Sequence, residues 1–209
     1  MRTIIKYARS GAASFISHLD MQRAFARALR RAELPVQYSE GFNPHILTSF
    51  AAPLSVGIAT QGDYLEVRMA ESRGGEEIKG ALNAVMPPDL HVAFAGELPE
   101  DCPKLMAISH SALYELAFEK EPEALCVFMQ NGPCVVQDRK NREVDLCALV
   151  LDLKADGKTV RAQVANSSAA ALNPIVLARF LSGGEARITR LECYCMARGE
   201  VVPYEKLGR

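Results

Sequence analysis

The sequence lacks the common motifs by which enzymes hold a cofactor. It has no GxxxxGK[ST] loop for nucleotide phosphates, no GxGxxG fingerprint for dinucleotides and no CxxxCxxC run for an iron–sulfur cluster. Its six cysteines include no CxxC pair and form no metal-ligand pattern with the four histidines. We therefore expect no cofactor and no metal in this chain, and we expect the cysteines to be reduced thiols in the core.

Long apolar runs are also absent. No run approaches the roughly 20 residues that span a bilayer, and the first 15 residues (MRTIIKYARSGAASF) lack the continuous apolar core and cleavage site of a signal peptide. We expect a cytoplasmic protein without membrane contact.

Cys193 and Cys195 form a CxC pair, which is compatible with metal binding. In a strand, however, both side chains would point to the same buried face of the sheet, and this accounts for the pair without a metal.

Charge is distributed unevenly. The 209 residues carry a net charge of −1, yet residues 1–60 hold seven Lys and Arg against three Asp and Glu, so this part is +4 and the rest of the chain is −5. With 49% hydrophobic residues, the chain can build the cores of one or two domains. A basic first part beside an acidic remainder favours a localised anionic partner.

Residues 17–32 carry the clearest helix signals. Ser17 and Asp20 fit a capping box, so Ser17 is the expected N-cap, and Pro35 should end the helix near Ala32 or Glu33. At 100° per residue, one side of this helix is apolar and the other is basic. The basic side carries Arg23, Arg27, Arg30 and Arg31. These arginines are either a solvated surface or a phosphate-binding face, because guanidinium groups match phosphate oxygens.

The loop that follows, YSEGFNPHILTSF from residue 38, is rich in side chains that can contact a ligand. Gly41 and the Asn43-Pro44 turn would fix its shape. Tyr38 and Phe42 could stack on unpaired bases, and Ser39, Asn43 and His45 could bond to base edges or phosphates. The alternative is a rigid turn whose aromatic side chains fill a core.

His45 and His18 raise an enzymatic alternative. A histidine titrates near neutral pH and can serve as general acid or base, so these two are the candidate catalytic residues of a metal-independent ribonuclease. His18 also lies at the first position of the expected helix, where a capping or packing role is common. Over catalysis, we favour a binding role for His45 and a capping or packing role for His18.

Hydrophobic periodicity predicts the element order βαββαβ in the first half of the chain. The predicted strands are residues 2–7, with a continuation through residue 15 as an alternative, then 47–58, 63–70 and 90–98. A turn is predicted at Gln61-Gly62, between the strands 47–58 and 63–70. The second predicted helix is 76–86, ended by Pro87-Pro88.

The second half repeats this order after a proline-bearing joint at residues 99–104. Strands are predicted at 111–119, 134–139, 143–155, 159–167 and 187–197, with a short helix at 122–130 and another at 173–181. We therefore predict an α+β fold of two tandem ferredoxin-like domains with antiparallel sheets, at residues 1–98 and 105–209.

Several of these segments together resemble a known family. Six segments lie in order between residues 17 and 67: SHLD, RALRRA, LPV, YSEGFNPH, SFAAPLSVG and DYLEV. Weaker features follow in VDL, NPIVLARFL and RITRLECY. This set is similar to the radical-SAM-linked family of uncharacterised bacterial proteins, which occur alone or fused behind a radical S-adenosylmethionine (SAM) domain. The resemblance implies a radical SAM protein as partner and an association with RNA-processing and ribosome-related genes. At the level of fold, the chain also resembles CRISPR repeat-processing endoribonucleases, which bind RNA with paired domains.

The sequence thus predicts an RNA-binding accessory protein that recognises RNA, or an RNA-containing substrate, for a radical SAM partner enzyme. Two alternatives remain open at this point: an RNA-processing enzyme that uses His45, and a protein-binding adaptor without RNA contact. The sequence does not determine the oligomeric state.

Overall fold

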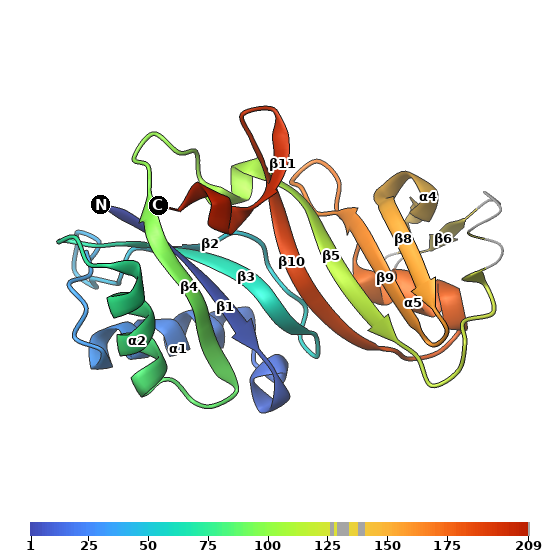
Figure 1. The fold of residues 1–209 in the computed structure, drawn as a ribbon, viewed down its shortest axis with the longest axis horizontal. Helices are drawn as coiled ribbons and strands as arrows, with labels where there is room; N and C mark the ends of the chain where they lie inside the picture. The colour runs from blue at the N-terminus through green and yellow to red at the C-terminus, as the bar shows by residue number, and fades with distance from the viewer. Residues whose placement is uncertain (126–127, 129–133, 138–140, 209) are drawn as a thin grey trace.

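The computed structural model describes residues 1–125, 128, 134–137 and 141–208. Within them, one nine-stranded, mostly antiparallel sheet runs through the molecule in the order β4-β1-β3-β10-β5-β9-β8, with β2 added to β3 and β11 added to β10 (Figure 1). A two-stranded sheet, β6-β7, lies apart from it. The predicted α+β fold with antiparallel strands is confirmed at this level.

The first half of the chain builds one end of the sheet. Its elements are β1 (Arg2–Arg9), α1 (His18–Arg31), β2 (Thr48–Phe50), β3 (Ala59–Arg68), α2 (Gly75–Val85) and β4 (Leu90–Leu98), with a 3-10 helix, η1 (Gly11–Phe15), after β1. The strands lie in the order β4-β1-β3-β2, and α1 and α2 pack beside them (Figure 1).

The second half builds the other end. It contains η2 (Leu105–Ile108), β5 (Ser109–Ala117), β6 (Val135–Gln137), β7 (Glu143–Asp145), α4 (Leu146–Leu149), β8 (Val150–Asp156), β9 (Thr159–Ala165), α5 (Pro174–Ser182), β10 (Arg187–Ala197), β11 (Glu200–Pro203) and η3 (Tyr204–Leu207). Its strands lie in the order β10-β5-β9-β8. Four residues of the short helix predicted at residues 122–130, namely 126, 127, 129 and 130, lie outside the described residues. No described helix is long and apolar enough to cross a membrane.

The two halves join where β3 and β10 run parallel. Thr189 pairs with Ala59, and Arg190 pairs with Thr60. A Cβ atom at Gly62 would lie 2.6 Å from the carbonyl oxygen of Leu191, so a glycine is required for β10 to approach β3 this closely. The prediction of a turn at Gln61-Gly62 is therefore wrong, because Gly62 lies inside β3.

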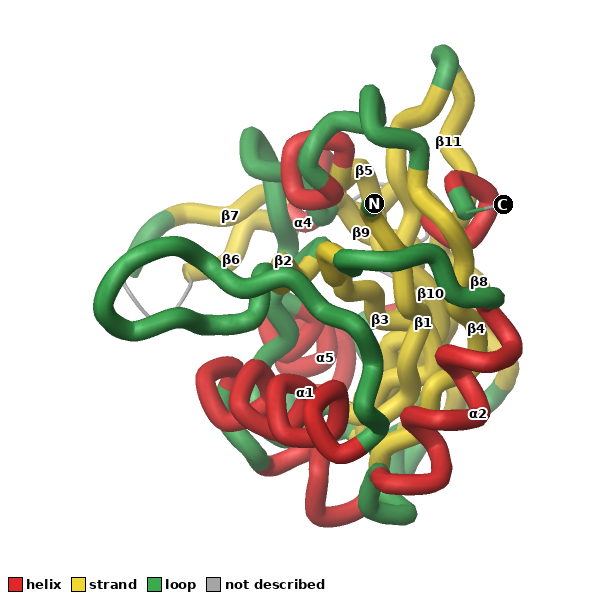
Figure 2. The backbone as a smooth tube through the Cα atoms, turned by 90° about the vertical axis from the view of Figure 1, so that its left-hand side faces the viewer, coloured by secondary structure: helices red, strands yellow, loops and turns green. Residues whose placement is uncertain are grey.

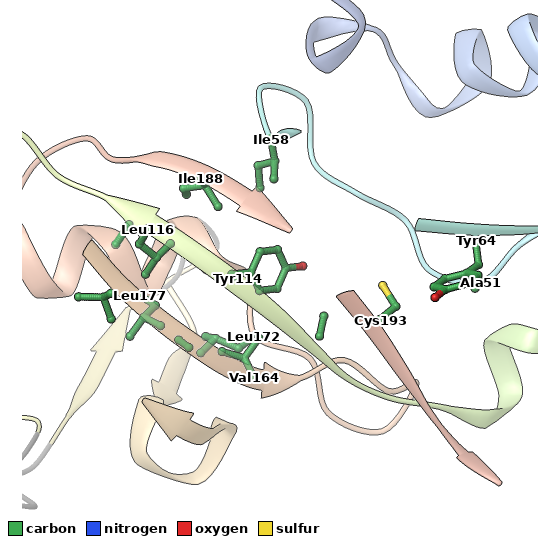
Figure 3. Packing of buried hydrophobic residues seen from close by; sticks show 14 of the residues in the cluster. Ala51, Ile58, Tyr64, Tyr114, Leu116, Val164, Leu172, Leu177, Ile188 and Cys193 are labelled. Carbon is green, nitrogen blue, oxygen red and sulfur yellow. The ribbon is translucent and has the colours of Figure 1, made fainter. Parts of the chain in front are cut away.

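Two clusters of buried side chains cover the sheet. One lies under α1 and α2 and centres on Phe25, Leu29, Leu65 and Leu82. The other packs α5 against the second half and continues across the junction into the first half (Figure 3). The labelled members in Figure 3 include Leu177 of α5 and Tyr64 of β3. The sheet and part of the core are therefore continuous between the halves, and the boundaries predicted at 1–98 and 105–209 stay a prediction.

Three segments differ from the predicted strands, and the first strand, β1, ends at Arg9 instead of continuing to residue 15. After Ser10, the chain forms η1 because the backbone N–H groups of Ser10 and Ala12 donate to the backbone and side chain of Asp89. The segment predicted as a strand at 47–58 leaves the sheet after Phe50, because the chain then bends through Pro53 and through Gly57 at φ +87°. The segment at 143–155 divides into β7, α4 and β8.

Candidate nucleic-acid interface

Helix α1 begins as the sequence predicts. The Ser17 hydroxyl accepts from the backbone N–H of Asp20 and donates to its carboxylate at 2.7 Å. The helix ends at Arg31, and Glu33 takes a left-handed conformation two residues later. The Ser17 hydroxyl and the Arg23 guanidinium together hold the pKa of Asp20 below its ordinary value.

The apolar side of α1 is buried against the sheet. Met21, Phe25, Ala28 and Leu29 are at most 1% exposed. The Phe25 ring contacts the edges of two other aromatic rings, Tyr7 of β1 and Phe50 of β2, at centroid distances of 4.8 and 5.9 Å. This packing fixes the helix, so its opposite, basic side has a defined orientation.

The four arginines of α1 are all exposed but have different contacts. Arg23 forms a 2.9 Å ion pair with Asp20, and Arg31 donates to the carbonyl of Val85 at the end of α2. Arg27 and Arg30 form no ion pair with any described residue. They are three positions apart and therefore lie on neighbouring turns of the same side. These two are the cations of the helix most available to an anionic ligand.

The loop after α1 is closed at its base. Tyr38 and Ile46 form a backbone bridge, and the backbone N–H of Ser39 donates to the carbonyl of His45 at 2.8 Å. The Ser39 hydroxyl is hydrogen-bonded to Nδ1 of His45 at 2.8 Å and accepts from the backbone N–H of His45. Residues 38–46, which we call the aromatic loop, are thus held by their own polar groups.

Phe42 lies at the tip of the aromatic loop and is completely exposed, at 106% of its reference area. Tyr38 is 46% exposed, and Asn43 is exposed as well. Gly41 has φ +111°, which a residue with a side chain rarely adopts, so this turn depends on glycine. Because the Phe42 and Tyr38 side chains are exposed, the alternative in which both fill a core is wrong. Figure 2 shows the loop extending beyond the body of the molecule.

The two predicted catalytic histidines occupy different environments. His45 is held by Ser39 within the aromatic loop, whereas His18 contacts the ring edge of Phe50 at 5.1 Å and has Gln22 3.3 Å from its Nε2. No contact between described residues joins His18 to the pair of Ser39 and His45. Of the two, His45 alone belongs to the surface that includes Phe42.

Sequence reasoning missed a buried charged cluster at the junction of the halves. Arg190 and Asp63 form a 2.8 Å ion pair and are each 2% exposed. The Arg190 guanidinium also donates to the hydroxyl of Tyr114 and to the carbonyl of Pro53. Burial alone would lower the pKa of Arg190, but Asp63 beside it raises that pKa well above its ordinary value. Arg190 through the carbonyl of Pro53, and Arg9 through the carbonyls of Ser55 and Ile58, hold the segment that follows β2.

Further ion pairs fasten other parts of the junction. Lys6 of β1 contacts Glu192 of β10 at 2.6 Å and Glu205 of η3 at 2.8 Å. Arg2 pairs with Glu66 and donates to several backbone carbonyls between residues 99 and 103, the segment that connects the halves. These cations serve the fold, so they are not available to a ligand.

Metal-binding chemistry is not evident in the described part of the chain. No three His, Cys, Asp or Glu side chains there are grouped to hold a metal ion. Cys193 and Cys195 are buried, at 1% and 0% exposure, as predicted for a strand face. Burial raises the pKa of each thiol to about 12.

A protein-family model described as "Uncharacterized protein conserved in bacteria (DUF2344)" matches residues 2–174. The chain belongs to the DUF2344 family. The matched part of this DUF2344 protein contains α1, the aromatic loop and Asp63, and it ends at the first residue of α5. No match was found among curated proteins. The family description assigns no activity.

Proposed function

We propose that this DUF2344 protein binds RNA through α1 and the aromatic loop. Its role is that of a cytoplasmic accessory protein, which recognises RNA or an RNA-containing substrate for a radical SAM partner enzyme. The observation that carries the RNA-binding part is the complete exposure of Phe42 on a loop closed by hydrogen bonds.

An exposed aromatic ring on an ordered loop suits an unpaired base. Stacking of a base on an aromatic ring contributes roughly 1–3 kcal/mol and does not depend on the base. Because Ser39 and His45 already order the loop, little conformational entropy is lost when a ligand binds. Tyr38 and Asn43 lie in the same loop and can add stacking and hydrogen bonds. The expected ligand is single-stranded RNA or an unpaired loop.

The cations near this loop supply the contacts to phosphate. Arg27 and Arg30 point away from the buried side of α1 and form no ion pair with described residues. The aromatic loop follows α1 in the chain and lies at the same end of the molecule (Figures 1 and 2). Guanidinium groups bind phosphate oxygens with two hydrogen bonds each, so this pair can position an RNA backbone.

The radical SAM partner is supported by the sequence resemblance. Since the sequence carries no cluster motif, the radical chemistry would take place on the partner. Our proposal also includes the finer assignment of two tandem ferredoxin-like domains. It is supported by the strand orders β4-β1-β3-β2 and β10-β5-β9-β8, in which the equivalent strands of the two halves have the same spatial order.

Replacing Phe42 with alanine should weaken binding of single-stranded RNA on the order of 10-fold, because it removes the ring on which one base stacks. The fold should be unaffected, since this ring buries nothing in the free protein. Filter binding with a short unstructured RNA measures the change. Phe15→Ala is the matched control, because Phe15 is also largely exposed, at 71%, but lies in η1. Equal losses of affinity in the two variants would contradict a specific role for the aromatic loop.

A second candidate function is RNA cleavage. It is favoured by the 2.8 Å hydrogen bond between Ser39 and His45, which orients the imidazole and leaves its Nε2 without a partner among the described residues. In this role His45 would remove the proton of a ribose 2′-hydroxyl, and Arg27 or Arg30 would stabilise the charge that develops on the phosphate.

If the protein cleaves RNA, the parent protein should shorten RNA and the His45→Ala variant should leave it intact. His18→Ala is the control, because His18 contacts Phe50 and not the aromatic loop. The reaction is followed by separating end-labelled RNA on a denaturing gel. RNA that stays full-length after long incubation with the parent protein removes cleavage as a function and leaves the binding proposal in place.

A further inference from the structure

The paired strands β6 and β7 bring two cysteines together. β6 and β7 pair in antiparallel register, with Val135 opposite Asp145. The next pair in this register is Cys134 and Leu146, and the backbone N–H of Leu146 donates to the carbonyl of Cys134 at 3.0 Å. Cys147 follows Leu146 directly, so the ladder fixes the spacing between the two cysteines.

The start of α4 places Cys147 beside the end of the β6-β7 ladder. Asp145 caps this helix, because its carboxylate accepts from the backbone N–H of Cys147 at 3.0 Å. The two cysteine side chains interact with each other. Cys147 is exposed, whereas Cys134 is 1% exposed. One thiol can therefore meet a small molecule from solution, and the other lies within reach behind it.

We propose that Cys134 and Cys147 form a reversible disulfide by exchange with low-molecular-weight disulfides such as oxidised glutathione. In the first step, the Cys147 thiolate attacks a sulfur of the glutathione disulfide, and one glutathione leaves as thiolate. In the second step, the Cys134 thiol loses its proton to water and attacks the Cys147 sulfur, which releases the second glutathione. Two protein thiols are oxidised, and one glutathione disulfide is reduced to two glutathione molecules.

The order of attack follows from the environments of the two thiols. Burial and the neighbouring Cys147 raise the pKa of Cys134 to about 11, so Cys134 is protonated at neutral pH and is a poor first nucleophile. Once Cys147 carries glutathione, the Cys134 thiol, which interacts with Cys147 in the free protein, is placed to attack it. The result is a covalent bridge between the residue before β6 and the start of α4.

The other described cysteines are in different surroundings. The Cys193 thiol contacts Asp63 at 3.7 Å, and the Cys195 thiol contacts the carbonyl of Val202 at 3.5 Å. Both are buried in β10, out of reach of a solution disulfide. Cys102 is partly exposed and provides a control thiol. Neither Cys134 nor Cys147 lies in α1 or in the aromatic loop, so this inference does not depend on RNA binding.

Intact mass spectrometry and peptide mapping without reductant, after treatment with oxidised glutathione, test the proposal. The parent protein should lose the mass of two hydrogen atoms at this site and yield a peptide pair linking Cys134 to Cys147. Cys134→Ser should instead retain one glutathione on Cys147, and Cys147→Ser should yield no bridge involving Cys134. Cys102→Ser should behave as the parent does.

Circular dichroism establishes that each variant is folded, and Cys134→Ala replaces Cys134→Ser if the serine variant is not. The proposal is overturned if the parent forms no linked pair, if the linked peptides join Cys134 or Cys147 to a different cysteine, or if Cys134→Ser leaves Cys147 unmodified. Dithiothreitol should restore the mass of the reduced parent, since the bridge is reversible.

Discussion

Replacing Arg190 with alanine is expected to lower the free energy of unfolding by about 3–5 kcal/mol, because the change leaves the Asp63 carboxylate buried without its cation. Arg190 also donates to the Tyr114 hydroxyl and to the carbonyl of Pro53, so these groups lose a partner as well. Chemical unfolding followed by circular dichroism measures the difference. A loss of this size would be a large share of the stability of a typical domain.

Two comparisons isolate the buried charge as the cause. Arg161→Ala removes a surface ion pair with Glu115, in which Arg161 is 62% exposed, and should cost about 0–1 kcal/mol. Adding Asp63→Asn to Arg190→Ala should recover part of the lost stability, because the unpaired charge is then gone. If Arg190→Ala cost no more than Arg161→Ala, the junction would not depend on this ion pair.

Reversing the charges of Arg27 and Arg30 together is expected to weaken RNA binding on the order of 100-fold at low salt. Each charge-assisted contact to phosphate contributes about 1.5 kcal/mol, and the variant loses two of them. The slope of log affinity against log salt should fall by about 1.4, since each phosphate contact to single-stranded RNA contributes about 0.7. Filter binding over a series of salt concentrations gives both quantities.

The matched control is Arg161→Glu with Arg187→Glu. It changes the net charge by the same amount, and both residues are exposed, but they lie in β9 and β10 of the second half. This control should leave most of the affinity and nearly the whole slope. A loss equal to that of the Arg27 and Arg30 variant would mean that net charge, and not the basic side of α1, governs binding.

Local structure could be predicted from the sequence where the signals are local. The capping residues Ser17 and Asp20 set the start of α1, and Pro35 set its end, because caps and prolines act within one helical turn. The exposed arginines followed from helical periodicity. The closed loop with Phe42 at its tip could be predicted only in part, since Gly41 and Asn43 indicate a turn but do not indicate which side chains face water.

The junction could not be predicted because it depends on pairings that are distant in sequence. Asp63 and Arg190 are separated by 127 positions, and each appears in its own segment as an ordinary charged residue of a strand. Gly62 indicates a turn when its segment is considered alone, whereas its actual role is to admit the backbone of β10. Only the assembled sheet reveals these roles, because they arise from contacts between strands.

The most direct test of RNA binding is the affinity of the purified parent protein for a short single-stranded RNA at low salt, measured by filter binding beside the Arg27→Glu, Arg30→Glu variant. Our account predicts saturable binding by the parent that weakens as salt rises, and binding by the variant that is far weaker and less sensitive to salt. Absence of measurable affinity in the parent, or identical curves for the two proteins, would contradict it.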